Sequence, residues 1–200
     1  MLAKGGRKPV LFLFGLMLFL SIFYITVYQN LIFPIVGMAI FLFILYFFRD
    51  PDREISEGIV SPADGKIQSI SQQGKSIEIF MNLWDVHVNR SPWSGKVEKI
   101  EHYPGKHLPA FLKNANKNER QFLVLSTGRG NIKIWQIAGI TARRIVPYLK
   151  KGDRIEKGER IGIVRFGSKV RLEFENKVEF TVKKGQRIKA GETSLGVWHE

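Results

Sequence analysis

Two uncharged, apolar stretches occupy the first 48 residues and constrain the fold of this chain more than any other feature. The first covers residues 10–28, the second covers residues 31–48, and the polar pair Gln29 and Asn30 separates them. A helix needs about 20 apolar residues to cross the roughly 30 Å hydrocarbon core of a bilayer, and each stretch is close to that length. Neither has the short apolar core and small-residue cleavage site of a signal peptide. The sequence therefore predicts a membrane anchor at residues 1–48, folded as a two-helix transmembrane hairpin, and a separate domain at residues 49–200.

Basic residues around the hairpin predict its orientation. They flank its two ends and not its turn: Lys4, Arg7 and Lys8 precede the first stretch, and Arg49 and Arg53 follow the second. Because lysine and arginine are enriched in cytoplasmic flanks, both ends are expected in the cytoplasm, with the following domain on the cytoplasmic side of the cell membrane. One long tilted or interfacial helix is the alternative, and it also leaves the rest of the chain beside a bilayer.

Composition narrows the classes of function. The sequence has no cysteine, which excludes disulfides, thiolate metal sites and a cysteine nucleophile. Three of the 31 lysine and arginine residues precede Arg49, which leaves 28 against 18 acidic residues after it, an excess of ten positive charges. Beside a membrane such a domain is attracted to anionic lipid headgroups, although nucleic acid or a phosphorylated substrate would also suit its charge.

The second domain has the pattern of a mainly β protein. Short runs of strand-forming residues, separated by turns that contain glycine, predict strands at residues 75–80, 121–125, 131–135, 171–175 and 177–182. Two segments occur twice. SPADGKIQSI at 61–70 matches SPWSGKVEKI at 91–100, and KKGDRIEKGERIG at 150–162 resembles KKGQRIKAGETSL at 183–195. Repeated turn–strand units predict a pseudo-symmetric β sandwich or barrel.

The second pair of repeats resembles the hammerhead turns of biotinyl and lipoyl carrier domains. Those carriers modify a lysine at a hairpin tip, which methionines usually frame. Met81 is the only methionine after Phe48, and no lysine stands beside it. We therefore expect the fold of the carriers without their function.

Gly167 and Ser168 stand between two apolar, strand-like stretches. Alone, such a pair predicts no more than an ordinary turn or bulge. Six motifs, the last of which contains this pair, occur along the chain: FFRDPDR at 47–53, VSPADGK at 60–66, DVHVNRSP at 85–92, HYPGK at 102–106, NER at 118–120 and FGSKV at 166–170. The whole set resembles the short form of the phosphatidylserine decarboxylase family, which includes archaetidylserine decarboxylases of archaea.

The resemblance implies a proenzyme that makes its cofactor from its own chain. Ser168 Oγ would attack the Gly167 carbonyl, and the resulting ester would undergo elimination and lose ammonia to leave a pyruvoyl group. The products would be a β chain of residues 1–167 and an α chain of residues 168–200. The pyruvoyl group would form a Schiff base with an anionic serine phospholipid, either phosphatidylserine or archaetidylserine, and accept electrons as CO2 departs.

The residue types at the cleavage site suit this chemistry independently of the family. Serine is an oxygen nucleophile and, once esterified, gives a leaving group for β-elimination. Glycine before it lets the backbone bend and leaves its carbonyl open to attack. A strained turn at Gly167 and Ser168 would raise the starting energy of the attack.

Asp64 and His87 are the expected helpers of Ser168. The resemblance implies a triad-like set in which an aspartate can hold the imidazole in the tautomer that accepts the serine proton. Asp64 lies in the matching motif, and the alternative is a turn residue before Gly65. Longer family members have two histidines three residues apart. His87 is the first, and Arg90 replaces the second, so His87 is the catalytic candidate and a purely structural histidine is the alternative.

Arg90 and Lys106 are the candidate substrate ligands. The planar guanidinium of Arg90 suits a phosphate or carboxylate, and a surface ion pair with an acid such as Asp85 is its alternative role. Lys106 is a further candidate contact for the lipid phosphate. His102 and His107 lack a surrounding cluster of acidic or histidine ligands, so we expect loop residues there and no metal.

Three classes of function follow from these patterns. The leading one is a membrane-attached lipid decarboxylase, the second is a membrane-tethered carrier or interaction domain, and the third, suggested only by charge, is a nucleic-acid-binding domain. Only the first predicts cleavage between Gly167 and Ser168, and we expect no nucleic-acid partner. The sequence leaves the oligomeric state open, including a homo-oligomer.

Overall fold

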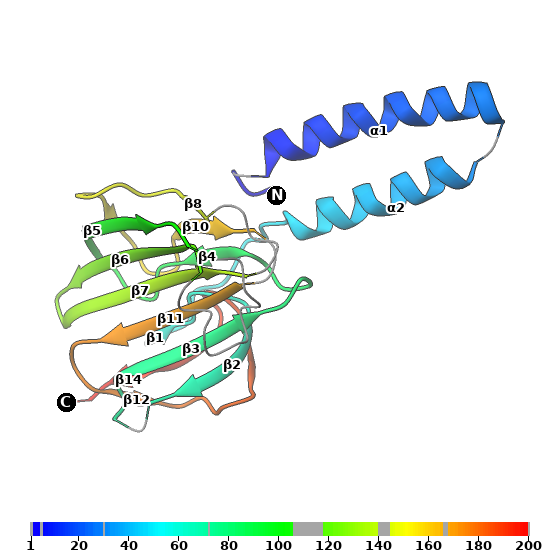
Figure 1. Ribbon diagram of the computed structural model, residues 1–200. Coiled ribbons are helices and arrows are strands. Elements are labelled where there is room, and N and C mark those ends of the chain that lie inside the picture. Colours follow the sequence, from blue (N-terminus) through cyan, green and yellow to red (C-terminus); the bar gives the residue numbers. More distant parts are fainter. Residues whose placement is uncertain are drawn as a thin grey trace. The chain divides into compact units, whose positions relative to one another are not determined.

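Two apolar helices, α1 (Arg7–Tyr28) and α2 (Ile32–Phe47), lie side by side in the first of two compact units, Met1–Pro51 (Figure 1). The rings of Phe14 and Phe41 pack between them with centroids 5.2 Å apart. The first helix is long and apolar enough to cross a membrane. The second has 16 residues, so it is about 24 Å long and shorter than the roughly 30 Å hydrocarbon core. α1 therefore fits the predicted first span, and a second span by α2 stays a prediction.

The second unit, Asp52–Glu200, is built from strands. The chain is seen here in a computed structural model that describes residues 2–4, 6–29, 31–71, 73–105, 118–139, 145–165 and 168–199. Its largest sheet has eight antiparallel strands in the order β13 (Arg187–Ile188), β2 (Gly65–Ile70), β3 (Ser76–Met81), β11 (Ser168–Phe174), β7 (Gly130–Ala138), β6 (Arg120–Thr127), β5 (Gly95–Tyr103) and β9 (Arg154–Ile155).

Two smaller antiparallel sheets complete the unit. Their strand orders are β1 (Ile59–Val60), β14 (Ser194–Trp198) and β12 (Val178–Phe180) in one, and β4 (Val88–Arg90), β10 (Arg160–Val164) and β8 (Ile145–Pro147) in the other. The predicted mainly β fold is confirmed.

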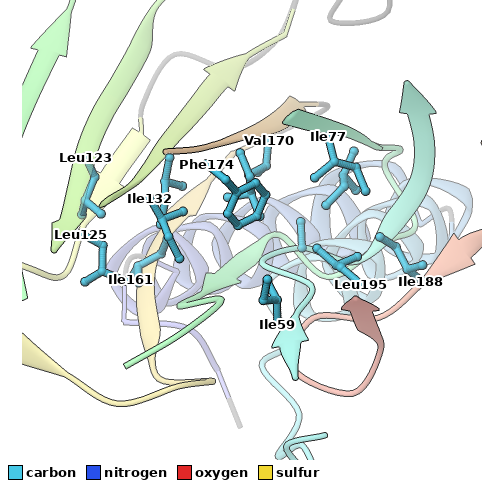
Figure 2. Packing of buried hydrophobic residues seen from close by; sticks show 14 of the residues in the cluster. Ile59, Ile77, Leu123, Leu125, Ile132, Ile161, Val170, Phe174, Ile188 and Leu195 are labelled. Atoms are coloured by element: carbon cyan, nitrogen blue, oxygen red, sulfur yellow. The ribbon is translucent and has the colours of Figure 1, made fainter. Parts of the chain in front are cut away.

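One apolar core joins the three sheets (Figure 2). Along β3, the side chains of Ile77, Ile79 and Met81 are fully buried, while the residues between them are partly exposed. The two small sheets contribute Ile59 from β1 and Ile161 from β10 to the same core. Because a strand points alternate side chains to opposite faces, the inner face of the large sheet is the one that packs on the small sheets, as in a sandwich.

The two pairs of sequence repeats occupy equivalent places in two similar halves. In one half Arg187 lies opposite Lys66, and in the other Arg154 lies opposite Lys96. A register shift follows two residues after the shared glycine in both, between Ile67 and Ser69 in β2 and between Val97 and Lys99 in β5. Strands β1–β3 with β11–β14 therefore form one half, and β4–β10 form the other. The predicted pseudo-symmetry is seen in the strand order, while the likeness to biotinyl and lipoyl domains stays a prediction.

The second half is inserted into the first at the strands that carry the candidate cleavage site. The ladder between β6 and β7 ends with Thr127 opposite Gly130, where a tight turn joins the two strands. The equivalent ladder between β3 and β11 ends with Met81 opposite Ser168. There the chain leaves after Met81, builds the entire second half, and returns at Ser168. The candidate cleavage site thus lies at a junction between two halves and not in a surface hairpin.

Candidate functional site

Ser168 is the first residue of β11, in the middle of the large sheet. It lies opposite Met81 of β3 on one side and Ala138 of β7 on the other. Its side chain shares the inner face with Val170, and both residues are fully buried. Among the described residues, Ser168 Oγ has no hydrogen-bond partner. A buried hydroxyl without a partner is unfavourable for folding, and such groups cluster where chemistry needs them.

The chain is held on both sides of the candidate cleavage site. Val164, the last residue of β10, donates its backbone N–H to the carbonyl of His87 at 3.2 Å. Ser168 is fixed by its two neighbouring strands. Gly167 lies outside the described residues, as does Lys106. Val164 of a small sheet and Ser168 of the large sheet therefore bracket the candidate cleavage site, and Val164 is bonded to the backbone of the predicted catalytic histidine.

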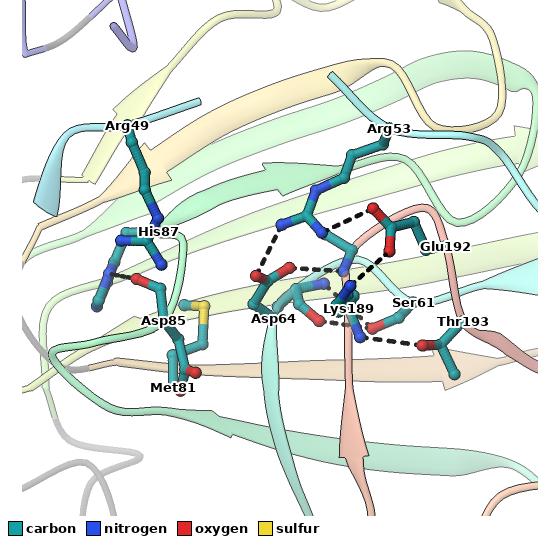
Figure 3. A network of polar contacts seen from close by, with 12 residues as sticks. Arg49, Arg53, Ser61, Asp64, Met81, Asp85, His87, Lys189, Glu192 and Thr193 are labelled. Carbon is teal, nitrogen blue, oxygen red and sulfur yellow. Dashed lines mark hydrogen bonds and ion pairs between the residues drawn. The ribbon is translucent and has the colours of Figure 1, made fainter. Parts of the chain in front are cut away.

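The ring of His87 is oriented by its own turn. Nδ1 lies 2.9 Å from the backbone carbonyl of Asp85, and the side chain is fully buried (Figure 3). A carbonyl only accepts hydrogen bonds, so Nδ1 carries the proton of the neutral ring and Nε2 is the basic nitrogen. This is the tautomer that a general base requires.

Asp64 lies in a cluster of charges that also contains Arg53 and Glu192 (Figure 3). Arg53 Nη2 donates to Asp64 Oδ2 at 2.8 Å, and Arg53 Nη1 donates to Glu192 Oε1 at 2.9 Å. The expected hydrogen bond between Asp64 and His87 is not formed among the described residues. The physical reason is that the Arg53 guanidinium attracts the carboxylate, while the Asp85 backbone carbonyl already holds the imidazole.

The charges in this cluster stabilise one another. Burial alone would lower the pKa of Arg53, but its hydrogen bond with Glu192 and the attraction of Asp64 outweigh that effect and raise it. The hydrogen bond from Arg53 lowers the pKa of Glu192. Arg53 precedes the candidate cleavage site and Glu192 follows it, so this ion pair joins the two chains that cleavage would produce.

A comparison of the two halves separates two roles of Asp64. Asp64 Oδ1 accepts a hydrogen bond from the backbone N–H of Ala190 at 2.8 Å. At the equivalent place in the other half, Ser94 Oγ accepts from the backbone N–H of Lys157 at 2.9 Å. That bond belongs to the shared fold. The bond to Arg53 uses the second carboxylate oxygen, which a serine does not have.

Backbone hydrogen bonds bring the motif of Asp64 beside the motif of His87. Arg90 donates its N–H to the carbonyl of Pro62 at 2.9 Å, and Val60 donates its N–H to the carbonyl of Pro92 at 3.1 Å. The Arg90 side chain is buried, and its Nη1 donates to the carbonyl of Gly158 at 2.9 Å. The structure thus gives Arg90 a backbone partner in place of the ion pair with Asp85, whose carboxylate binds Arg187 at 2.7 Å.

A chain of buried amides lies behind the site. Gln121 donates to Gln136 at 2.8 Å, Gln136 donates to Asn89 at 2.7 Å, and Asn89 contacts the sulfur of Met81 at 3.5 Å. All three amides are at most 2 % exposed. Since Met81 lies opposite Ser168, this network supports the strand beside Ser168.

Sequence reasoning missed the roles of Arg53 and Asn89, although both lie inside motifs that it identified. The repeats contained a signal for Arg53: an acid stands at Asp64 where the matching residue Ser94 is neutral, and a buried acid needs a cation.

In the described part of the chain, no group of three or more histidine or acidic residues could hold a metal ion.

Comparison with known proteins gives a consistent result. The family described as "Phosphatidylserine decarboxylase" matches residues 40–196. A Streptomyces coelicolor protein named "Phosphatidylserine decarboxylase proenzyme" is 49% identical over 155 residues, which cover 76% of this chain and 71% of that protein. An Archaeoglobus fulgidus protein named "Putative archaetidylserine decarboxylase proenzyme" is 46% identical over 158 residues, which cover 79% and 78%. Among solved structures, glucose permease IIA from Mycoplasma capricolum is similar with a TM-score of 0.40 and 15% identity, over 70% of this chain and 92% of that one.

Proposed function

This chain belongs to the phosphatidylserine decarboxylase family, and from that membership we propose that it is a proenzyme which cleaves itself at Gly167–Ser168 and then decarboxylates a serine phospholipid. The substrate is the serine headgroup that phosphatidylserine and archaetidylserine share, and the products are CO2 and the ethanolamine lipid. The observation that carries the proposal is the buried Ser168 hydroxyl, which has no hydrogen-bond partner among the described residues and heads a central strand.

Self-cleavage needs a base for the Ser168 proton, and we assign that role to Nε2 of His87. The Asp85 carbonyl holds the ring with Nε2 as the basic nitrogen. The peptide bond becomes an ester of Ser168 Oγ. Elimination then removes the Ser168 Cα proton and breaks the bond between Cβ and Oγ, so that the Gly167 carboxylate leaves and dehydroalanine remains. Water then hydrolyses the imine form of dehydroalanine. The former Ser168 nitrogen leaves as ammonia, and a carbonyl remains at the amino-terminal end of the small chain.

Asp64 acts in this proposal as a positioning residue. Its two oxygens connect Arg53 of the large chain, residues 1–167, with Ala190 of the small chain, residues 168–200. After cleavage the small chain stays in place, because β11 lies between β3 and β7 and β14 lies between β1 and β12. The two chains are thus permanent partners in one folded domain.

The pyruvoyl group supplies an electrophilic carbonyl that binds the substrate amine and takes up electrons as CO2 leaves. The Ser168 hydroxyl, which is buried and has no hydrogen-bond partner in the described part of the chain, fits this group, because the pyruvoyl carbons are those of Ser168 itself. His87 returns a proton to the substrate carbon once the serine hydroxyl no longer exists. Arg90 and Lys106 are assigned to the lipid phosphate or carboxylate. No metal takes part in the proposal.

The remaining assignments follow from the substrate. The enzyme works at the cell membrane on its cytoplasmic side, anchored by residues 1–48. The excess of ten positive charges after residue 48 favours an anionic lipid surface. The comparisons do not favour a biotinyl or lipoyl-like carrier, and a likeness to that fold is proposed only for the turns at residues 150–162 and 183–195.

The repeats supply a matched pair of variants that test Asp64. Asp64→Ser retains an oxygen for the Ala190 N–H, as Ser94 does for Lys157, and removes the charge that holds Arg53. We expect this variant to fold and to cleave at least about tenfold more slowly, the cost of roughly 1.4 kcal/mol in the barrier. Ser94→Ala removes the shared turn bond and an exposed hydrogen bond from Ser94 Oγ to Glu156. Neither bond involves Arg53, so this variant should cleave at the normal rate. Cleavage of Asp64→Ser at the wild-type rate would mean that Asp64 acts only as a turn residue.

Two measurements on each variant distinguish the roles of His87 and Arg90. They are the rate of chain cleavage on gels and CO2 release from serine-lipid vesicles. His87→Gln removes the base and should remain uncut. Arg90→Lys retains a positive charge but not the planar fork, so it should cleave normally and turn over lipid poorly. Normal cleavage in His87→Gln together with lost cleavage in Arg90→Lys would reverse the two assignments.

A further inference from the structure

We propose that the turn at residues 82–85 is a membrane-contacting tip, which enters the bilayer interface and holds the candidate site at the level of the lipid headgroups. Leu83 is 42 % exposed and Trp84 is 62 % exposed. In the described part of residues 52–199, the other exposed large apolar side chains are Ile55 and Val197, and neither adjoins another in sequence. Tryptophan is enriched at membrane interfaces, because its ring is apolar and its N–H remains near water.

The turn is held rigidly from within. Asn82 N–H donates to Asp85 Oδ2 at 2.9 Å, Trp84 N–H donates to Asn82 Oδ1 at 2.9 Å, and Asp85 N–H donates to the Asn82 carbonyl at 3.2 Å. These bonds fix the backbone on both sides of Leu83. The two apolar side chains are therefore presented by an ordered turn, which lowers the entropy lost when they enter a membrane.

The tip is close to the reacting serine. Leu83 is two residues from Met81, so their Cα atoms are at most about 7 Å apart. Met81 lies directly opposite Ser168, where paired Cα atoms are about 5 Å apart. The tip therefore lies within roughly 12 Å of the Ser168 Cα atom, and interfacial elements enter a bilayer by about 5–10 Å. A tip at that depth leaves the site beside the headgroups while the acyl chains remain in the membrane.

The charges around the tip suit an anionic lipid surface. The Asp85 carboxylate is neutralised by Arg187 at 2.7 Å, and the Arg187 side chain is 65% exposed. Lys66 is exposed and lies opposite Arg187 in the adjacent strand. Because Arg187 balances Asp85, Lys66 leaves a net positive charge beside the apolar tip, the combination that binds membranes containing anionic lipids.

The fold itself does not require apolar residues here. In the other half, the equivalent strands are joined by a turn that carries Gly128 and Arg129. Leu83 and Trp84 follow Met81, where the chain leaves the first half to build the second. An exposed tryptophan at this junction therefore has no counterpart in the equivalent turn, which favours a role in binding.

This inference rests on the proposed function, because a lipid substrate is what gives the tip its use, but its first test needs no catalysis. Full-length protein is reconstituted into phosphatidylcholine and phosphatidylglycerol vesicles whose acyl chains carry bromine, which quenches tryptophan fluorescence on contact. Trp84→Phe retains an apolar tip and removes one fluorophore. We expect quenching to fall by about twofold or more in Trp84→Phe, because Trp135 and Trp198 lie in strands and Trp93 packs against the core. Equal fractional quenching in the two proteins would overturn the proposal.

The second test compares two forms of the substrate. In Leu83→Asp/Trp84→Asp, CO2 release from serine-lipid vesicles should fall at least about tenfold, while release from a short-chain, monomeric serine lipid stays within about twofold, because only the vesicle must be contacted. Val197→Asp, at an exposed apolar residue of β14, should change neither rate. Equal loss on both substrates, or no loss on vesicles, would contradict a membrane role. If wild-type protein decarboxylates neither substrate, the proposed function fails, and the quenching result still decides the role of the tip.

Discussion

Ser168→Ala should stabilise the uncut chain, although serine is the residue on which the proposed chemistry depends. The Ser168 residue is fully buried, and its hydroxyl has no hydrogen-bond partner among the described residues. A buried polar group without a partner costs about 1–3 kcal/mol, and alanine removes that group without changing the strand. We therefore expect the free energy of unfolding to rise by about 1–3 kcal/mol.

The comparison needs two uncut chains, because cleavage itself changes stability. His87→Gln is expected to remain uncut and provides such a background. Adding Ser168→Ala to it removes only the hydroxyl oxygen of Ser168. At about 2–4 °C per kcal/mol for a protein of this size, thermal unfolding in a fixed detergent should show a clear rise in Tm. Ser61→Ala in the same background is the matched control. Ser61 is also fully buried, but its hydroxyl donates to the Ala63 carbonyl at 2.7 Å, so its loss should lower stability by about 1 kcal/mol.

The two substitutions must change Tm in opposite directions, with a rise for Ser168→Ala and a fall for Ser61→Ala. If Ser168→Ala lowers Tm as much as Ser61→Ala does, the Ser168 hydroxyl is hydrogen-bonded in the uncut chain. The nucleophile would then have to break a bond before it attacks, and the unpartnered hydroxyl would no longer support the proposed function.

Three further predictions concern the anchor, the charge cluster and the buried amides. Removal of residues 1–48 should release the domain from membranes and leave cleavage intact, whereas salt washing should not extract the full-length protein; release by salt alone would contradict insertion. Because its folded pKa is lowered, Glu192 contributes stability that is present above its ordinary pKa of about 4.3 and lost as pH falls through the folded pKa, so Glu192→Gln should remove that part of the acid dependence of Tm. Gln136→Leu leaves Asn89 and Gln121 without their amide partner and should cost about 2–4 kcal/mol in urea unfolding; an unchanged midpoint would mean that water replaces the amide.

Much of the fold could be predicted because it repeats. The matching segments at residues 61–70 and 91–100 begin equivalent strands, and the glycine turns at 150–162 and 183–195 pair with them in both halves. What the repeats could not predict is the insertion of one half into the other. That arrangement depends on contacts far apart in sequence, such as Met81 with Ser168, which no local pattern encodes.

The sequence was sufficient to predict which residues form the candidate site, but not which hydrogen bonds they make. Ser168, Asp64 and His87 lie in motifs that the sequence displays, yet the expected pairing of Asp64 with His87 is replaced by bonds to Arg53 and to the Asp85 carbonyl. Hydrogen-bond partners depend on which side chains the fold brings within 3 Å, and a motif fixes only their order. The exposure of Trp84 was likewise not apparent, since an isolated aromatic residue in a strand-rich sequence usually packs in the core.

Self-cleavage at Gly167–Ser168 is tested by the intact mass of purified full-length protein, followed by Edman sequencing of each chain. We expect two chains that separate between Gly167 and Ser168. The small chain should be lighter than a serine-terminated peptide by one ammonia and should resist Edman degradation, because its first nitrogen has been lost. Catalytically active protein that consists of one uncut chain would rule out a pyruvoyl group made from Ser168, as would a small chain that begins with an intact serine.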